Sequence, residues 1–198
     1  MMRSMILLAL AIMLGLPQLA RAEIKTMILA GGCFWCLQHD MKQIKGVVEA
    51  KSGYAGGDRP QPTYQDYNKL SEAYKTAHLE VVEIKYDSTV ISPKELIRYF
   101  LRKIDPTDGE GQFCDRGSYY RPAIFISSDA EKFLAESEIK LGEAAIKKTF
   151  SVDLLPSAAF WAAEDYHQDY AEKNPLQYKF YRYRCGRDAR VEDVWGKQ

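Results

Sequence analysis

Four cysteines carry the most reactive chemistry in this sequence. Cys33 and Cys36 have two residues between them, whereas Cys114 and Cys185 are isolated. Two cysteines at this spacing on a helix share one face, so their sulfurs can meet as they do in disulfide oxidoreductases. An even number of cysteines also permits two structural disulfides in any of three pairings. These residues therefore indicate redox chemistry, structural disulfides or a metal site.

The position of Cys33 favours a nucleophile. An apolar run over 24–29 ends at Gly31 and Gly32, and apolar residues then recur at spacings of three and four. This pattern predicts a strand, a tight turn and a helix, with Cys33 at the start of the helix. Unpaired backbone N–H groups at a helix start favour the thiolate. We therefore expect a lowered pKa for Cys33.

The Cys33–Cys36 motif alone does not distinguish thiol exchange from zinc binding. A thioredoxin-like exchanger needs the motif at a strand-to-helix turn, which this sequence offers. Zinc needs four ligands, and the four cysteines with His39 or His78 in reserve could supply them. No second CxxC motif or close Cys/His pair is present, so the spacing argues against a metal site.

The elements that must position these residues follow from apolar spacing and turn residues. We expect strands over 24–29, 78–86 and 123–127, another beginning at 47–50, and loops over 52–63 and 107–120. Helices are expected from Phe34 to Gly46, from Ser92 to Ile104, and from Ser128 toward Lys148. A capping box of Ser92 and Glu95 marks the start of the second of these helices. The order strand, helix, strand, strand, helix, strand predicts an α+β domain with a split βαβ core, an antiparallel sheet with helices packed on one face.

The remainder after Phe150 is expected to be an irregular C-terminal extension. It should contain an extended piece near 152–155 and a helical piece near 159–171. Aromatic and basic residues then alternate over 178–184, and we interpret this segment as a solvated strand or tail.

Residues 1–22 have the build of an export signal. Arg3 precedes an apolar run over 5–16, and Ala20 and Ala22 are small residues spaced for cleavage. The run is shorter than the roughly 20 apolar residues of a membrane span. We therefore expect a signal peptide over 1–22 and one domain over 23–198, periplasmic or secreted, with an uncleaved anchor as the alternative. The 27 basic and 27 acidic groups balance, so the chain lacks the basic footprint of a nucleic-acid-binding protein.

Seven short strings together resemble the A-type peptide methionine sulfoxide reductases. GGCFW at 31–35 is similar to the family signature, and six further strings follow in the family's order: SGYAGG at 52–57, QPTY at 61–64, TAHLE at 76–80, DPT at 105–107, DRGSYYR at 115–121 and AEDYHQ at 163–168. Two positions depart from the family pattern: Ala77 stands where glycine is usual, and His39–Asp40 replaces an acidic and apolar pair. Neither touches a proposed catalytic role.

The resemblance implies that the split βαβ core is ferredoxin-like, and it also implies a role for each matching residue. Cys33 would attack the sulfoxide sulfur and Glu80 would protonate its oxygen, which leaves poorly unless a neutral carboxyl acts as general acid. Tyr64 and Tyr120 would hydrogen-bond the oxygen, and Asp115 would support the site. Phe34 and Trp35 would form an aromatic cradle for the S-methyl group. Glu80 has the same parity along its strand as Val82 and Ile84, which favours a covered face. Without the resemblance, the alternatives are a surface acid on an edge strand for Glu80 and ordinary core residues for both tyrosines.

The same resemblance implies how the enzyme is recycled. Cys33 would become a sulfenic acid and condense with a second thiol. Cys185 and Cys36 are equal candidates for that thiol, and Cys114 is the third. A thioredoxin-like dithiol would then reduce the disulfide. We expect no bound cofactor or metal, a monomer, and the S epimer of methionine sulfoxide, free or in proteins, as substrate.

Two other functions remain open at this point. In a CxxC disulfide reductase or isomerase, Glu80 and the two tyrosines would be dispensable. A noncatalytic module that binds sulfoxide or zinc would show stoichiometric binding without turnover.

Overall fold

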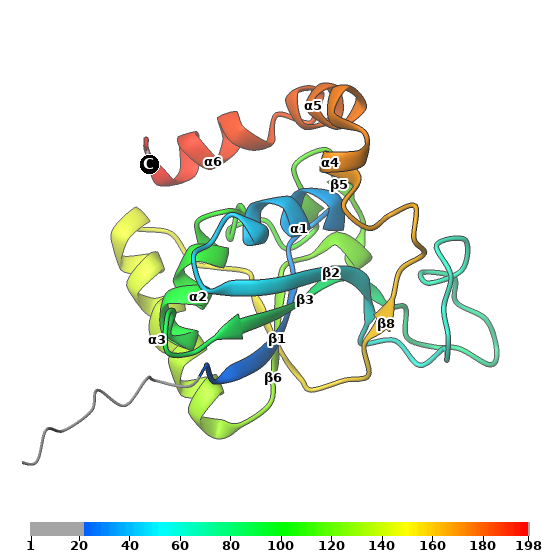
Figure 1. Ribbon diagram of the computed structural model, residues 1–198, viewed down its shortest axis with the longest axis horizontal. Coiled ribbons are helices and arrows are strands. Elements are labelled where there is room, and N and C mark those ends of the chain that lie inside the picture. The colour runs from blue at the N-terminus through cyan, green and yellow to red at the C-terminus, as the bar shows by residue number, and fades with distance from the viewer. Residues whose placement is uncertain (1–21, 198) are drawn as a thin grey trace, which may run out of the picture.

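A computed structural model describes residues 22–197 of the chain, so the predicted signal peptide lies almost wholly outside the described residues. Within the described part, six strands form one sheet in the order β7-β6-β1-β3-β2-β8 (Figure 1). The strands are β1 Ile24–Ala30, β2 Val47–Ala55, β3 Leu79–Asp87, β6 Ala123–Ile126, β7 Asp153–Pro156 and β8 Trp161–Ala162. Among residues 22–197, no helix combines the length and the apolar character of a bilayer span.

The centre of the sheet confirms the predicted split βαβ core. β6, β1, β3 and β2 pair antiparallel in that order. Helix α1, Phe34–Lys42, connects β1 to β2, and helix α2, Pro93–Leu101, leads from β3 toward β6. β7 extends the sheet in parallel beside β6, and helix α3, Asp129–Ile146, packs against α2. The fold is thus the expected α+β domain, with the first cysteine motif beside its central strand.

The main hydrophobic core lies between the sheet and the helices α1 and α2. Its buried members include Leu37 and Met41 of α1, Phe100 of α2 and Ile84 of β3. A smaller cluster that includes Val81 occupies the other face of the sheet. Burial at this level stabilises the fold by about 25 cal/mol for each Å² of apolar surface removed from water. This packing holds the start of α1 against β3.

Two segments that were expected to be loops contain strands. β2 continues to Ala55 because Gly53 has no side chain, and a Cβ there would lie 2.4 Å from the carbonyl oxygen of Trp161 in β8. The glycine therefore permits β8 to pair with β2. Within 107–120, β4 (Gly111–Gln112) pairs with β5 (Asp115–Arg116), and a 3-10 turn follows over Ser118–Tyr120.

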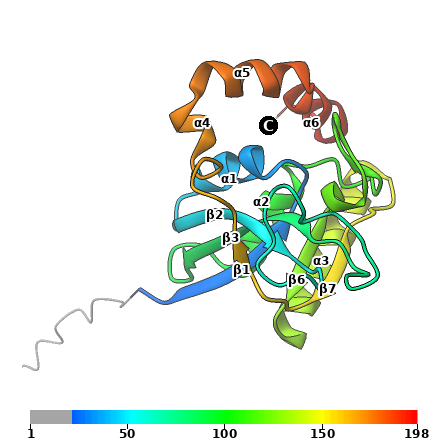
Figure 2. The same ribbon diagram turned by 90° about the vertical axis from the view of Figure 1, so that its right-hand side faces the viewer.

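The C-terminal part is more helical than the sequence suggested. The helical piece expected over 159–171 is wrong, because residues 161–162 form β8 and helix α4 covers only Tyr170–Lys173. The strand or tail expected over 178–184 is also wrong. It lies in helix α5, Pro175–Arg184, which begins at a proline in the favourable first turn and is followed by helix α6, Arg187–Trp195. Figures 1 and 2 show α4, α5 and α6 arching over α1 on the side away from the sheet.

Candidate active site

Cys33 lies at the turn between β1 and α1, as the sequence predicted. It occupies the N-cap position of α1. Gly32, just before it, has a φ of +81°, and a Cβ there would lie 2.6 Å from Cβ of Gln112. Glycine adopts this left-handed conformation without a steric cost, and it lets the turn approach the buried Gln112. The tight turn thereby holds the sulfur at the first turn of the helix.

Glu80 faces this turn from β3. Its carboxyl is buried, and the backbone N–H of Phe34, the residue after Cys33, donates a hydrogen bond of 3.0 Å to its Oε2. Burial raises the pKa of Glu80 to about 8, although the bonds from Phe34 and Tyr67 oppose the rise. Removal of water disfavours a carboxylate, so this acid holds its proton at neutral pH. The structure thus brings the two central predicted residues together.

Three tyrosines surround the Glu80 carboxyl, and the sequence analysis missed one of them. The Tyr67 hydroxyl donates to Oε1 of Glu80 over 3.2 Å, and its ring is almost wholly buried. Tyr120 also hydrogen-bonds Glu80, and Tyr64 hydrogen-bonds Tyr120. Tyr64 is 40% exposed and is the most exposed of the three tyrosines. Tyr67 lies in a segment without regular periodicity, so no apolar pattern marked it.

Phe34 and Trp35 form an aromatic wall next to the nucleophile. The Trp35 ring stacks on Tyr170 with centroids 3.7 Å apart and planes 6° from parallel. Its indole N–H donates to Nδ1 of His167 over 3.0 Å. The ring of Phe34 lies 6.5 Å from that of Tyr64 and 5.0 Å from that of His167. His167 therefore orients the wall from a turn, within the segment 159–171 that the sequence predicted to be helical.

The pKa predicted for Cys33 is wrong in direction. Burial raises the pKa of Cys33 well above its usual value, and the hydrogen bond with Cys36 and the negative charge of Glu80 raise it further. A hydrogen bond with Tyr181 opposes the rise. The helix start is where we expected it, but burial outweighs its partial charge. Protonation of Glu80 removes its negative charge, and so removes that contribution to the raised pKa of Cys33.

Cys36 has the opposite environment. Its hydrogen bond with Cys33 lowers the pKa of Cys36 to about 7, and the charges of Arg187 and Arg182 act in the same direction. Arg187 is buried, and its Nε lies 3.4 Å from Oδ2 of Asp40, which also binds Arg182. The two arginines come from α5 and α6, so the C-terminal helices supply the positive charge that stabilises a thiolate at Cys36.

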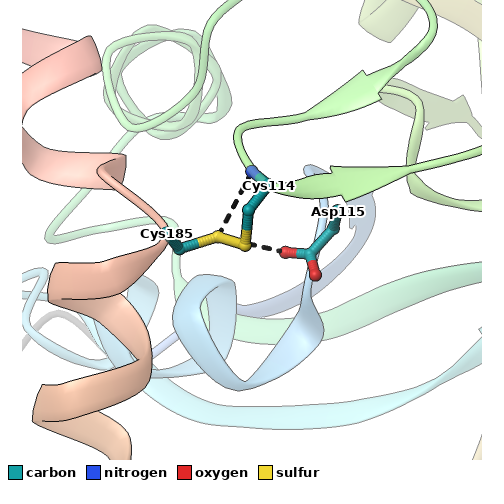
Figure 3. Close-up of side chains that lie close together, drawn as sticks. All are labelled: Cys114, Asp115 and Cys185. Carbon is teal, nitrogen blue, oxygen red and sulfur yellow. Dashed lines mark hydrogen bonds between the residues drawn. A yellow bond between two sulfur atoms is a disulfide. The ribbon is translucent and has the colours of Figure 1, made fainter.

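The other two cysteines are joined to each other. Cys114 and Cys185 form a disulfide at the end of α5, beside Asp115 (Figure 3). Oδ2 of Asp115 lies 3.7 Å from Sγ of Cys185 and accepts a 2.5 Å hydrogen bond from Tyr181. Among the described residues, Cys114, Asp115 and Cys185 are the single group spaced to hold a metal ion, but their two sulfurs are bonded together. The four cysteines thus divide into a buried thiol pair and a disulfide.

Comparison with known proteins agrees with this arrangement. Residues 25–198 match the family described as peptide methionine sulfoxide reductase. The chain belongs to this family. The reductase is 42% identical to peptide methionine sulfoxide reductase MsrA 2 of Caulobacter vibrioides over 91% of this chain and 90% of that protein.

Solved structures show the same likeness. Mxr1 of Saccharomyces cerevisiae in reduced form has a TM-score of 0.66 and 30% identity, covering 77% of this chain and 86% of that chain. Mxr1 in complex with Trx2 has a TM-score of 0.51 and 25% identity, covering 75% and 85%. This reductase is therefore an oxidoreductase that acts on methionine sulfoxide, and it carries a disulfide-forming pair in Cys114 and Cys185.

Proposed function

We propose that Cys33 and Glu80 carry out the reduction together. The observation that carries this proposal is the hydrogen bond from the Phe34 N–H to Glu80, which holds a protonated acid next to the nucleophilic sulfur. The Cys33 thiolate attacks the sulfoxide sulfur and forms an S–S bond, while Glu80 gives its proton to the oxygen. The resulting hydroxyl group then passes to the Cys33 sulfur, and the S–O and S–S bonds to the methionine sulfur break. Methionine leaves as the thioether with the two electrons that Cys33 loses, and Cys33 remains as sulfenic acid.

The neighbouring side chains support the same substrate. Tyr64 and Tyr120 are close enough to the acid to hydrogen-bond the sulfoxide oxygen, and Asp115 supports the site through Tyr181. Phe34 and Trp35 offer ring surfaces to the S-methyl group, because ring faces attract the partly positive sulfur. We assign the S epimer to this pocket on the strength of the family resemblance.

We propose that Cys36 resolves the sulfenic acid. It is hydrogen-bonded to Cys33, and its pKa of about 7 supplies a thiolate at neutral pH. Attack of Cys36 on the Cys33 sulfur forms the disulfide and releases water. Of the two cysteines ranked first from the sequence, Cys185 is bonded to Cys114 and is therefore not a free thiol. A thioredoxin-like dithiol then returns two electrons by exchange, a role supported by the yeast relative's complex with Trx2.

We propose that the enzyme works as a monomer outside the cytoplasm, after cleavage near Ala22. The residue pattern over 1–22 supports export. The Cys114–Cys185 disulfide supports an oxidising compartment, because such bonds persist outside reducing cytosol. Cytosolic thioredoxin would not reach this location, so the donor is a thioredoxin-like protein that receives electrons through the membrane. Fractionation that found the protein only in the cytosol, with its first 22 residues intact, would refute this location.

The reaction is tested with peptides that carry the S or the R epimer of methionine sulfoxide. With dithiothreitol as reductant, the protein should consume the S epimer only, and Cys33→Ser should consume neither. Consumption of the R epimer, or full activity of Cys33→Ser, would refute the assignment. Reduction of insulin by the wild type and by Glu80→Gln alike, without sulfoxide turnover, would instead show a disulfide reductase.

The resolving cysteine is identified by disulfide mapping after one turnover without reductant. We expect a Cys33–Cys36 bond in the wild type, in Cys114→Ser and in Cys185→Ser, because the neighbouring thiol is present in all three. A bond from Cys33 to Cys185 in the wild type would show that Cys36 is not the resolving residue.

A further inference from the structure

Tyr181 is a partly buried residue of α5 that supports the site with Asp115 but takes no chemical step in the proposed reaction. Its hydroxyl donates to Oδ2 of Asp115 over 2.5 Å and also hydrogen-bonds the Cys33 sulfur. Its ring meets Trp35 edge-on, with centroids 6.0 Å apart and planes at 81°. One phenol therefore contacts both the nucleophile and a carboxyl group that comes from a different part of the chain.

The disulfide fixes this contact from both sides. Cys114 is the residue before Asp115, and Cys185 lies one helical turn after Tyr181. The Cys114–Cys185 bond and the hydrogen bond from Tyr181 to Asp115 thus join the same two segments next to each other. A cross-link so close to a hydrogen bond restricts the motion of both partners, so covalent structure holds the Tyr181 phenol beside Asp115.

We propose that Tyr181 is a further catalytic residue, whose hydroxyl relays a proton from the Cys33 thiol to Asp115 as the thiolate forms. The thiol proton passes to the Tyr181 oxygen, and the Tyr181 proton passes to Asp115. Tyr181 stays a neutral phenol, and the new thiolate accepts its hydrogen bond. Nothing is oxidised or reduced in this step. The inference rests on the proposed attack by Cys33, because it explains how a buried thiol loses its proton.

The environment of Asp115 favours proton transfer in this direction, from Cys33 toward Asp115. Burial raises the pKa of Asp115, which makes this carboxyl a better proton acceptor than an ordinary aspartate. The charge of Arg187 opposes that rise from α6.

Cys33 is faced by other titratable groups as well. They are Cys36 on its own helix, Glu80 on β3 and the phenol of Tyr64. Cys36 competes for the same proton, so the test removes it.

The test compares alkylation of Cys33 by iodoacetamide across pH 5–10 in a Cys36→Ser background. There Cys33 is the one free thiol, because Cys114 and Cys185 are bonded. Tyr181→Phe should raise the pH at half-maximal rate by about one, which slows alkylation at pH 7 about tenfold. Tyr183→Phe, an exposed tyrosine on the same helix, is the matched control and should leave the profile unchanged. Equal profiles for Tyr181→Phe and the Cys36→Ser reference would overturn the proposal.

A second variant separates the relay from a loss of structure. The effect of Asp115→Asn on alkylation should be present with Tyr181 and absent in the Tyr181→Phe variant, because Asp115 acts through the phenol. Equal effects in both backgrounds would overturn the relay. An intact Cys114–Cys185 disulfide, checked by mass, shows that α5 is in place. Alkylation requires no sulfoxide, so these results stand whether or not the proteins turn over methionine sulfoxide, which tests the proposed function separately.

Discussion

Replacing Glu80 by glutamine removes the proton that the proposed reaction delivers to the sulfoxide oxygen. The amide keeps the size of the side chain and an oxygen that accepts from the Phe34 N–H, so the pocket should keep its shape. General acids contribute about 10²- to 10⁴-fold to a rate. Glu80→Gln should therefore lower kcat by about that factor.

The pH dependence of the reaction rate gives a second quantitative prediction for Glu80. With a pKa of about 8, Glu80 is protonated below that pH and ionised above it. At pH 7 about ten molecules hold the proton for each that lacks it, and at pH 9 the ratio is reversed, so the wild-type rate divided by the Glu80→Gln rate should fall about tenfold between these two pH values. The thiolate fraction of Cys33 rises with pH in both proteins and cancels in this ratio, and the amide does not titrate.

The assay is single-turnover formation of methionine from methionine sulfoxide, followed by chromatography from pH 6 to pH 10. Glu83→Gln is the matched control, since Glu83 lies on the same strand at the opposite parity. This control should match the wild type in rate and in profile. A Glu80→Gln rate within threefold of wild type at pH 7, or a ratio of the two rates that does not fall between pH 7 and pH 9, would refute the role of Glu80 as the acid.

Three further predictions concern the surroundings of the site. Tyr67→Phe removes a donor that lowers the pKa of Glu80, so the fall in its rate relative to that of Glu80→Gln should move to higher pH; an unmoved fall would contradict this. Arg187→Met removes a buried charge bonded to two backbone carbonyls, and urea titration should show about 3 kcal/mol less stability; a change below about 1 kcal/mol would show that the charge is not needed for folding. Cys114→Ser opens a disulfide that spans 71 residues and should cost about 2–4 kcal/mol, matched by reduction of the wild type; equal stability with the oxidised wild type would contradict the bond's structural role.

The sequence predicted the residues whose roles depend on local pattern. The strand, glycine turn and helix around Cys33 follow from spacing, and the parity of Glu80 with Val82 and Ile84 placed it on a covered face. The capping box at Ser92 likewise marked the start of α2, and the structure shows both of its hydrogen bonds. Local rules sufficed here because neighbouring residues decide these features.

What the sequence did not predict depends on contacts between distant segments. Tyr67 and Tyr181 reach the site from a loop and from a helix that the alternation of aromatic and basic residues concealed. Tyr178, Tyr181 and Cys185 recur at spacings of three and four on the inner face of α5, and that signal could have revealed the helix. The raised pKa of Cys33 was missed for the same reason, because burial by α5 is a tertiary effect.

The central claim is that the sulfoxide oxygen is transferred to Cys33. The most direct measurement mixes Cys36→Ser protein with one equivalent of methionine sulfoxide, without reductant, in the presence of dimedone, which traps sulfenic acid. We predict one methionine released per chain and one dimedone adduct, located on Cys33. Methionine formed without an adduct on Cys33, or an adduct on another cysteine, would contradict the mechanism.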